Sequence, residues 1–573
     1  MAAASASSGF IQSTPQLRNQ FTSDPSLQRI FTNRLPKEVS EDVLSDLHDF
    51  GQYVVSDEIF DYVQDAESNP PTVETYDAFG NRVNRLRTSY GWKKEKDLAA
   101  SHGIIAAAYE RKYGQDSRVY QFLKYYLYAP SSALFTCPLA MTDGCARVLE
   151  IYGVRRDVFD HLTSRDPSNF WTSGQWMTER SGGSDVSGTE TYATKLPGTE
   201  NKYEVSGFKW FSSATDSQVA LLLAREHEKG KLSCFLGDIK SGGANIVRLK
   251  NKLGTKPLPT AELELRNLKA ELIGDRERGV AVISAVLNIT RIHNSVNAAA
   301  FLRRSLEIVK EFSLVRKVFG QPLHTVASHV HTLADLEVRQ NALMQITFRC
   351  VALLGKSECG SASADELFLM RCLPSLVKAY TGKRALAGVS ECMEAMGGVG
   401  YLENEPALNI ARLERDAQVL TIWEGTTNVL CDDFVSVVHA KAQHSVSAFR
   451  RFLEKTLQNS DRSLSEQILG SFEVWAKYIQ GSTLASLRSR GRAVGFYFAD
   501  IVSAALLSED AAFDNDPRAV EIARRYAARL SGSDPLAKFS ENSASDYNTA
   551  AVFHNDYLIV FGKPPEKDPR SKL

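Results

Sequence analysis

The stretch Tyr203-Glu-Val-Ser-Gly-Phe-Lys-Trp-Phe211 decides the fold, because it alternates apolar and polar residues in a chain that otherwise has helical spacing. Alternation with a period of two is typical of a strand with one buried face. Similar short runs occur nearby, at 219–224, 232–237 and 261–265, and Gly, Pro and Asn separate them. We therefore predict a β domain, a small sandwich or barrel, over residues 168–274.

Helical spacing prevails on both sides of this β domain. Residues 1–167 predict an N-terminal helical domain, with turn signals at 68–71 and 79–81. Residues 275–440 predict a helical bundle, and residues 441–573 an additional helical domain. The predicted fold class is mostly α with a central β domain. It is not a Rossmann arrangement, because the Gly-rich stretch at 396–401 lacks a preceding strand and the dinucleotide spacing.

Composition excludes several classes of protein. The 67 Lys and Arg nearly balance the 68 Asp and Glu, so no long-range field gathers nucleic acid or an anionic membrane. The eight cysteines are dispersed, without a CxxC pair or a Cys/His cluster at zinc spacing. No apolar run approaches the roughly 20 residues of a membrane-spanning helix. We expect a water-soluble protein from a reducing compartment, without a membrane span or a metal site.

The chain ends in Ser571-Lys572-Leu573 after a polar, Pro-containing stretch. A terminal SKL is the address that the peroxisomal import receptor reads. We therefore expect a peroxisomal location, with that receptor as a partner; the alternative is an ordinary polar tail.

The segment Met177-Thr-Glu-Arg-Ser-Gly-Gly-Ser-Asp185 combines hydroxyls with a glycine pair at the entrance to the β domain. Such a loop lets backbone amides and hydroxyls approach a flat polar ring edge, although alone it is equally typical of a surface turn.

This segment resembles the MTE…GSD flavin loop of the acyl-CoA dehydrogenases, and residues 207–212 resemble that family's GxKxWIT strand. The resemblance implies FAD as the cofactor. It places Thr178 against the flavin and Ser184 where flavin and substrate phosphates meet. Trp210 would stack near the flavin and Ser212 would take the hydroxyl role. The cofactor residues that it implies in this half of the chain are Met177, Thr178, Gly183, Ser184, Trp210 and Ser212.

The predicted bundle adds matches to the same family. Arg316-Lys-Val-Phe-Gly-Gln-Pro-Leu323 resembles its RxxFGxxL segment, in which the Arg contacts the FAD of a neighbouring subunit. The resemblance therefore assigns Arg316 and Phe319 to the cofactor, and Arg316 implies an oligomer of at least two subunits, with a homotetramer expected. Gly397 and Gly398 resemble the turn that meets the cofactor's phosphate or ribose face. A departure from the family is the His-rich run of His324, His329 and His331, whose spacing does not favour a metal site.

Ile422-Trp-Glu-Gly-Thr-Thr-Asn-Val-Leu430 carries the expected chemistry. Removing the α-proton of an acyl thioester needs a carboxylate in a dry pocket opposite a hydride acceptor. The resemblance makes Glu424 this catalytic base, and burial against the flavin should raise its pKa. Around it, the resemblance assigns Trp423, Thr426 and Asn428 to the cofactor.

Details such as residues 75–82, 137–142 and the extra C-terminal domain resemble the AidB-like branch of the family. The leading hypothesis is an FAD-dependent dehydrogenase or oxidase that acts on an acyl-CoA substrate, with oxygen or an electron-transfer protein as electron acceptor. One alternative is an AidB-like flavin-containing protective protein with weak dehydrogenase activity and DNA binding, which the near-neutral C-terminal domain disfavours. Another is a biosynthetic flavoenzyme on the same fold.

Overall fold

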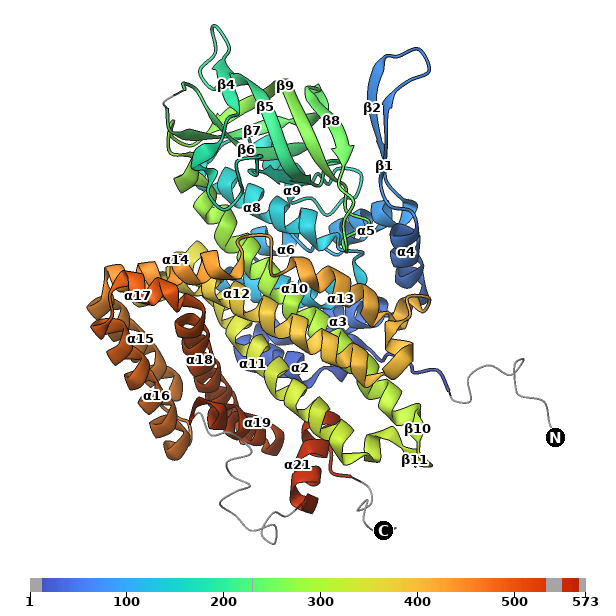
Figure 1. Ribbon diagram of the computed structural model, residues 1–573, viewed down its shortest axis with the longest axis vertical. Coiled ribbons are helices and arrows are strands. Elements are labelled where there is room, and N and C mark those ends of the chain that lie inside the picture. The colour runs from blue at the N-terminus through green and yellow to red at the C-terminus, as the bar shows by residue number, and fades with distance from the viewer. Residues whose placement is uncertain (1–12, 229, 532–548, 566–573) are drawn as a thin grey trace, which may run out of the picture.

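The computed structural model describes residues 13–228, 230–531 and 549–565 of the chain (Figure 1). Ser571–Leu573 lies outside these residues, so the peroxisomal address stays a prediction. The described chain forms a β domain at one end and helices through the rest of the molecule.

The N-terminal region is largely helical. Local caps start several of its helices; for example, Asp24 accepts the backbone N–H groups of Ser26 and Leu27, and Pro25 occupies the first helical position. Its helices are α1 (Gln20–Ser23), α2 (Pro25–Arg34), α3 (Lys37–Tyr53), α4 (Asp57–Ser68), α5 (Tyr90–Ser101), α6 (Ala106–Tyr109), α7 (Ser117–Tyr128), α8 (Thr136–Tyr152) and α9 (Arg156–Leu162).

A β-hairpin interrupts these helices, where the sequence predicted only a turn. Strands β1 (Thr72–Tyr76) and β2 (Arg82–Arg87) pair antiparallel around Phe79 and Gly80. The hairpin is held by long-range contacts, because Asn84 Nδ2 donates to Asn245 Oδ1 of the β domain at 2.8 Å. Such contacts are invisible to local periodicity.

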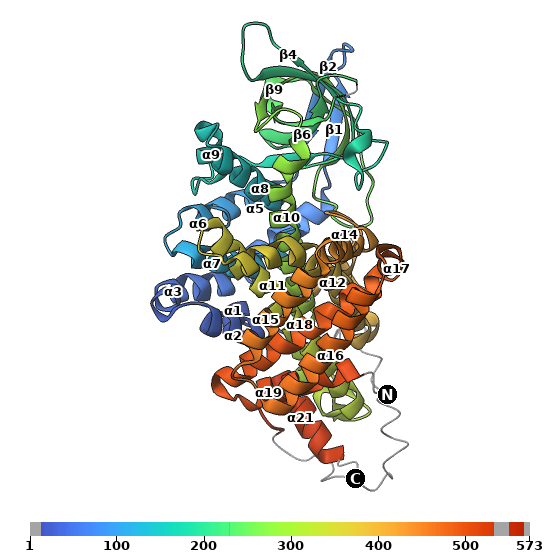
Figure 2. The same cartoon turned by 90° about the vertical axis from the view of Figure 1, so that its left-hand side faces the viewer.

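The middle region is a curled, mostly antiparallel sheet, in which β6 pairs parallel with β3 and β4 (Figure 2). Its central strands run in the order β6, β4, β5, β9 and β7, and β7 also pairs with β6, so the sheet folds round into a barrel. Its strands are β3 (Ser173–Trp176), β4 (Tyr192–Lys195), β5 (Lys202–Ser213), β6 (Val219–Arg225), β7 (Leu232–Asp238), β8 (Ala244–Leu249) and β9 (Thr260–Ile273). The barrel is one of the two forms that the sequence predicted.

A helical bundle follows the barrel. Arg291 of the first helix bonds Ser375 of α12, and Leu302 lies against Gly388, so α10 and α12 run parallel. A Cβ at Gly388 would lie 2.6 Å from Leu302 Cδ1, so glycine permits this close approach. The bundle helices are α10 (Gly279–Val315), α11 (Ala327–Glu358), α12 (Ala364–Ala395), α13 (Ile410–Val419) and α14 (Thr427–Ala440), and a short hairpin of β10 (Lys317–Val318) and β11 (Gln321–Pro322) joins the first two.

The predicted additional helices are present and pack on the bundle, mainly against α11 and α14. They are α15 (Ala442–Leu457), α16 (Arg462–Gly481), α17 (Leu484–Ser489), α18 (Gly491–Asp514), α19 (Pro517–Ala528) and α21 (Thr549–Phe561). Helix α18 is long and apolar enough to cross a membrane, but 72% of its apolar window is buried inside the protein. It is therefore the core helix of this domain. The predicted fold class is confirmed in all its parts.

Candidate active site

Glu424 lies in the turn between α13 and α14, at a left-handed backbone position with φ of +57°. Gly425 follows with φ of +106°. A non-glycine residue rarely adopts this conformation, so the surrounding structure must hold it there. Thr426 then begins α14 as its N-cap residue.

The Glu424 carboxylate receives a hydrogen bond of 2.6 Å from Thr290 Oγ1 of α10. Burial raises the pKa of Glu424, and the Thr290 hydroxyl, the charges of Arg291 and Lys378, and the Gln175 amide all oppose this rise. The direction agrees with the expectation from sequence. A carboxylate whose pKa is raised is a stronger base than an exposed one, which suits the removal of a proton from a substrate.

Two cations hold the backbone of this turn. Arg291 Nε donates to the Glu424 carbonyl at 3.3 Å, and Lys378 Nζ donates to the Gly425 carbonyl at 2.6 Å. Trp423 Nε1 donates to Asn294 Oδ1 on α10. The long helices α10 and α12 thus fix the turn from outside.

The predicted flavin loop and the strand β5 are joined in the structure. Trp210 N donates to the Thr178 carbonyl at 2.9 Å. Lys209 Nζ donates to Glu179 Oε1 at 2.6 Å, and both side chains are buried. Met177 is buried beside Thr178. The two sequence motifs therefore form one structural unit.

Several features of this unit fit the edge of a flavin ring. Ser212 Oγ is buried and has no hydrogen-bond partner within the described chain, so it is available to a ligand. A Cβ at Gly183 would lie 2.5 Å from Thr178 Oγ1, so only glycine keeps the loop close to that hydroxyl. Gly183 and Ser184 are exposed on the loop. FAD therefore fits the donors that the chain offers here.

The two aromatic residues at the end of β5 differ in exposure, and the contact of Trp210 with the flavin stays a prediction. A bulge interrupts the pairing with β9 between Lys209 and Ser212. The Trp210 ring has Lys250 Nζ 3.3 Å from its centroid, whereas Phe211 is 49% exposed. Phe211, which the sequence reasoning did not select, precedes Ser212 in the chain and is the more exposed of the two aromatic residues.

A second group of predicted residues lies far from Glu424. Arg316 follows α10, 26 positions after Thr290, which corresponds to about 39 Å of helix. Phe319 is fully exposed at the tip of the β10–β11 hairpin, and Figure 1 shows this hairpin at the opposite end of the molecule from the barrel. Gly397 and Gly398 follow the end of the parallel helix α12. Within a single subunit, Arg316, Phe319, Gly397 and Gly398 therefore lie away from the Glu424 turn.

Asn428 and the histidines make contacts that the sequence did not predict. Asn428 Oδ1 accepts a 2.8 Å hydrogen bond from Arg492 of α18 in the additional domain. His331 lies 3.0 Å from Asp556 of α21, and the His324 ring packs against Tyr557 of the same helix. Within the described residues, no cluster of His, Cys, Asp and Glu could hold a metal ion. His324 and His331 thus contact the last described helix, whereas His329 bonds Ser313 of α10.

Arg291, Lys378, Thr290 and Gln175 were missed by the sequence reasoning. A signal was present for two of them, since Arg291 and Lys378 are charges inside apolar helical stretches, and a charge is rarely buried without a specific partner.

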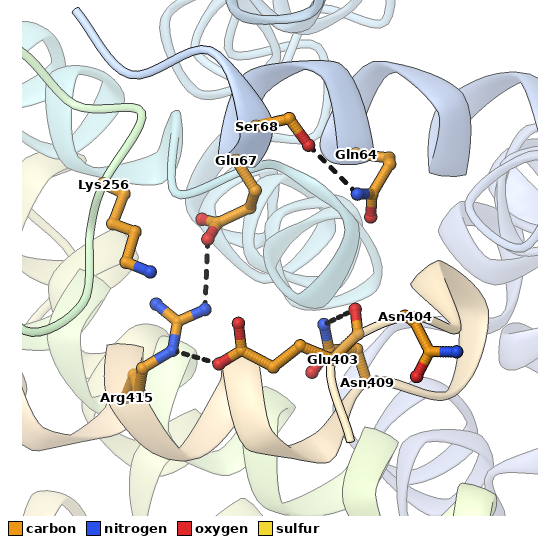
Figure 3. A pocket seen from close by; sticks show the side chains of 8 residues that line it. All are labelled: Gln64, Glu67, Ser68, Lys256, Glu403, Asn404, Asn409 and Arg415. Atoms are coloured by element: carbon orange, nitrogen blue, oxygen red, sulfur yellow. Dashed lines mark hydrogen bonds and ion pairs between the residues drawn. The ribbon is translucent and has the colours of Figure 1, made fainter. Parts of the chain in front are cut away.

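A separate polar pocket of about 360 Å³ lies between the N-terminal helices and α13 (Figure 3). Glu67 and Glu403 both form ion pairs with Arg415, at 3.2 Å and 2.7 Å. The predicted site residues are absent from its lining, which consists of Gln64, Glu67, Ser68, Lys256, Glu403, Asn404, Asn409 and Arg415. The ion pair between Glu67 and Arg415 therefore links α4 to α13, the helix that leads into the Glu424 turn.

Comparison with known proteins identifies the family. Three family models match in order: the AidB N-terminal domain over residues 12–166, the acyl-CoA dehydrogenase middle domain over 174–268 and its C-terminal domain over 277–438. Acyl-CoA dehydrogenase family member 11 of Caenorhabditis elegans is 40% identical over 90% of this chain and 88% of its own length. The chain belongs to the acyl-CoA dehydrogenase family. It is accordingly an FAD-dependent acyl-CoA dehydrogenase.

Two further relatives place this acyl-CoA dehydrogenase within the family. The putative acyl-CoA dehydrogenase AidB of Escherichia coli is 28% identical over 69% of this chain and 74% of its own. The crystal structure of C. elegans ACDH-11 in complex with C11-CoA superposes with a TM-score of 0.86 at 39% identity, covering 92% of this chain and 94% of that one. The AidB-like resemblance is confirmed.

Proposed function

We propose that this acyl-CoA dehydrogenase forms an α,β double bond in an acyl-CoA, with Glu424 as the base that removes the α-proton. The observation that carries the proposal is the carboxylate's environment: it is bonded by Thr290, lies near Arg291 and Lys378, and has a pKa that burial raises. When bound, FAD supplies the acceptor for the β-hydride.

The chain's own residues have separate parts in this reaction. Glu424 Oε takes the proton, and the Thr290 hydroxyl holds the carboxylate in one orientation. Arg291 and Lys378 keep the backbone of the turn in place. Glu424 is half-buried in the single chain and Ile422 is exposed, so bound FAD and substrate would complete the exclusion of water from the carboxylate.

We propose a straight acyl chain of medium to long length as the substrate class. The relative solved with C11-CoA shares 39% of its sequence and most of its length with this chain, which supports a similar acyl pocket. A panel of straight, branched and aromatic acyl-CoAs of graded length tests this proposal.

We propose an assembly of at least two subunits, with a homotetramer as the expected form. The separation of about 39 Å along α10 between Thr290 and Arg316 supports it, since a cofactor-binding Arg316 would then serve the FAD of another subunit. Light scattering of the holoenzyme measures the subunit number.

The electron acceptor is oxygen or an electron-transfer flavoprotein, and these differ in product. Oxygen yields hydrogen peroxide during turnover, whereas a dehydrogenase turns over only with the carrier or an artificial dye. Peroxide detection with and without dye separates the two.

The arginines of the additional helices give no support to a DNA-binding role. Arg524 and Arg525 form ion pairs with Glu521, and Arg525 also with Asp556. Arg488 and Arg492 donate to Ser436 and Asn428. The carboxylates of Glu521 and Asp556 offset the positive charges of Arg524 and Arg525, which a phosphate-tracking surface would need.

The decisive experiment is an anaerobic titration of the yellow holoenzyme with the acyl-CoA panel, in wild type and Glu424→Gln. Flavin bleaching by one chain-length class, abolished in the variant, is the expected result. Bleaching that persists in Glu424→Gln would assign the base elsewhere, and a wild type that no acyl-CoA bleaches would exclude the proposed reaction.

A further inference from the structure

The left-handed turn that carries Glu424 has an unusual external support. Lys378 lies in the middle of α12, and its side chain is fully buried. Within the described chain, the Gly425 carbonyl at 2.6 Å is the acceptor of its ammonium group, and no carboxylate lies within ion-pair distance. A buried cation without a direct counter-ion is costly, so its retention calls for a function.

The charges around Lys378 come from three elements. Glu424 of the turn attracts its charge and Arg291 of α10 repels it, while Asp433 of α14 faces Arg291. Burial lowers the pKa of Lys378 to about 7, Glu424 acts in the opposite direction, and Arg291 lowers it further. The Glu424 carboxylate is thus the negative charge that interacts with the Lys378 ammonium group.

We propose that Lys378 is a positioning residue for the dehydrogenation, which holds the Glu424–Gly425 turn by its hydrogen bond and places a positive charge behind the catalytic carboxylate. The inference rests on the proposed role of Glu424 as the base. In the reaction, the proton leaves the substrate α-carbon and binds Glu424 Oε, while the electron pair of the broken C–H bond stays on the substrate. Below about pH 7, where Lys378 is protonated, its positive charge favours the ionised carboxylate that starts this step.

Two substitutions separate the two parts of this role. Lys378→Gln keeps an N–H donor for the Gly425 carbonyl but removes the charge. Lys378→Met removes both, and an apolar side chain suits the buried position. Lys383→Met is the matched control, because Lys383 lies on the same helix but about 140° further round it.

The measurement is kcat as a function of pH with the best substrate of the panel, together with FAD content and the midpoint of thermal unfolding. Loss of the charge should raise the pKa of Glu424, so the acidic limb should move up by about one pH unit in both variants. On the acidic side of the profile, kcat of both variants should therefore be about tenfold lower than that of wild type at the same pH. The difference should disappear at higher pH for Lys378→Gln. Lys378→Met should also show a lower plateau, since its turn is no longer held.

The outcomes are distinct. An unshifted acidic limb in both variants, with FAD retained, would overturn the inference, as would an equal shift in Lys383→Met. A loss of activity that is the same at every pH would indicate a purely structural role and would overturn it as well. A wild type without dehydrogenation, in contrast, is a failure of the proposed function.

Discussion

Thr290 Oγ1 donates a 2.6 Å hydrogen bond to Glu424 Oε2 across 134 positions of sequence. The bond favours the ionised carboxylate, whereas burial favours the protonated form. The helix α10 thus contributes to the basicity of a residue on a distant turn.

Thr290→Val removes this hydrogen bond with little change in volume. The pKa of Glu424 should rise, so the acidic limb of the kcat profile should move to higher pH, by about one unit. Activity at high pH should stay near wild type. Thr332→Val on the exposed face of α11 serves as the control, and a pH profile identical to wild type in Thr290→Val would count against the assigned contact.

Lys209→Met leaves Glu179 buried without its partner inside the barrel. Breaking a buried pair costs about 3–5 kcal/mol, because an unpaired charge remains. We expect a large fall in unfolding midpoint and loss of FAD on gel filtration. Adding Glu179→Gln should recover much of the stability, and Lys202→Met, on the exposed start of the same strand, should change little.

Phe211→Ser should weaken FAD binding more than Trp210→Phe does. Phe211 is the exposed aromatic, so its removal costs the fold little but removes contact area for a flat ring. A loss of about tenfold in FAD affinity is expected, measured by quenching of flavin fluorescence. If Phe211→Ser and wild type bind FAD with equal affinity, the aromatic contact with the flavin would be assigned to Trp210.

Hybrid oligomers test whether a site draws on two subunits. Arg316→Gln and Glu424→Gln should each inactivate a homo-oligomer, the former by loss of FAD. When the two variants are co-expressed with different tags and the mixed oligomers are purified through both tags, activity should return. Some sites of these hybrids then combine an intact Glu424 with an intact Arg316. Hybrids without activity would mean that each chain builds its site alone.

Lys378 also predicts how stability depends on pH. Its folded pKa of about 7 lies below its ordinary value of 10.5, so the unfolded chain binds one more proton between these values. Wild type should therefore gain stability relative to Lys378→Met as pH rises from 7 towards 10, by about 1.4 kcal/mol per pH unit. Denaturant unfolding at several pH values checks this; parallel curves for the two proteins would contradict it.

The fold was predictable because each region has its own period. The alternation at 203–211 predicted strand β5, and the helical spacing on both sides predicted the surrounding helices. The hairpin at 72–87 was missed, since its stability comes from Asn245 and other residues far along the chain. Local patterns carry no information about such partners.

The site was predictable only where residues are adjacent in sequence. Trp423, Glu424 and Thr426 share one segment, and the structure places them on one turn. Thr290 and Lys378 reach the same turn from other helices, so only tertiary packing reveals them. Their assignment to the cofactor or the reaction still depends on experiments of the kind described above.

The geometry of helix α10 constrains the number of residues between Thr290 and Arg316. A single residue inserted between Arg291 and Arg316 would rotate every later side chain by about 100° about the helix axis and shift it by about 1.5 Å. The guanidinium of Arg316 would then face another direction while Thr290 and Glu424 stayed in place. Insertions and deletions in this lineage should therefore be confined to surface turns such as 196–201, and the count of residues from 290 to 316 should be constant.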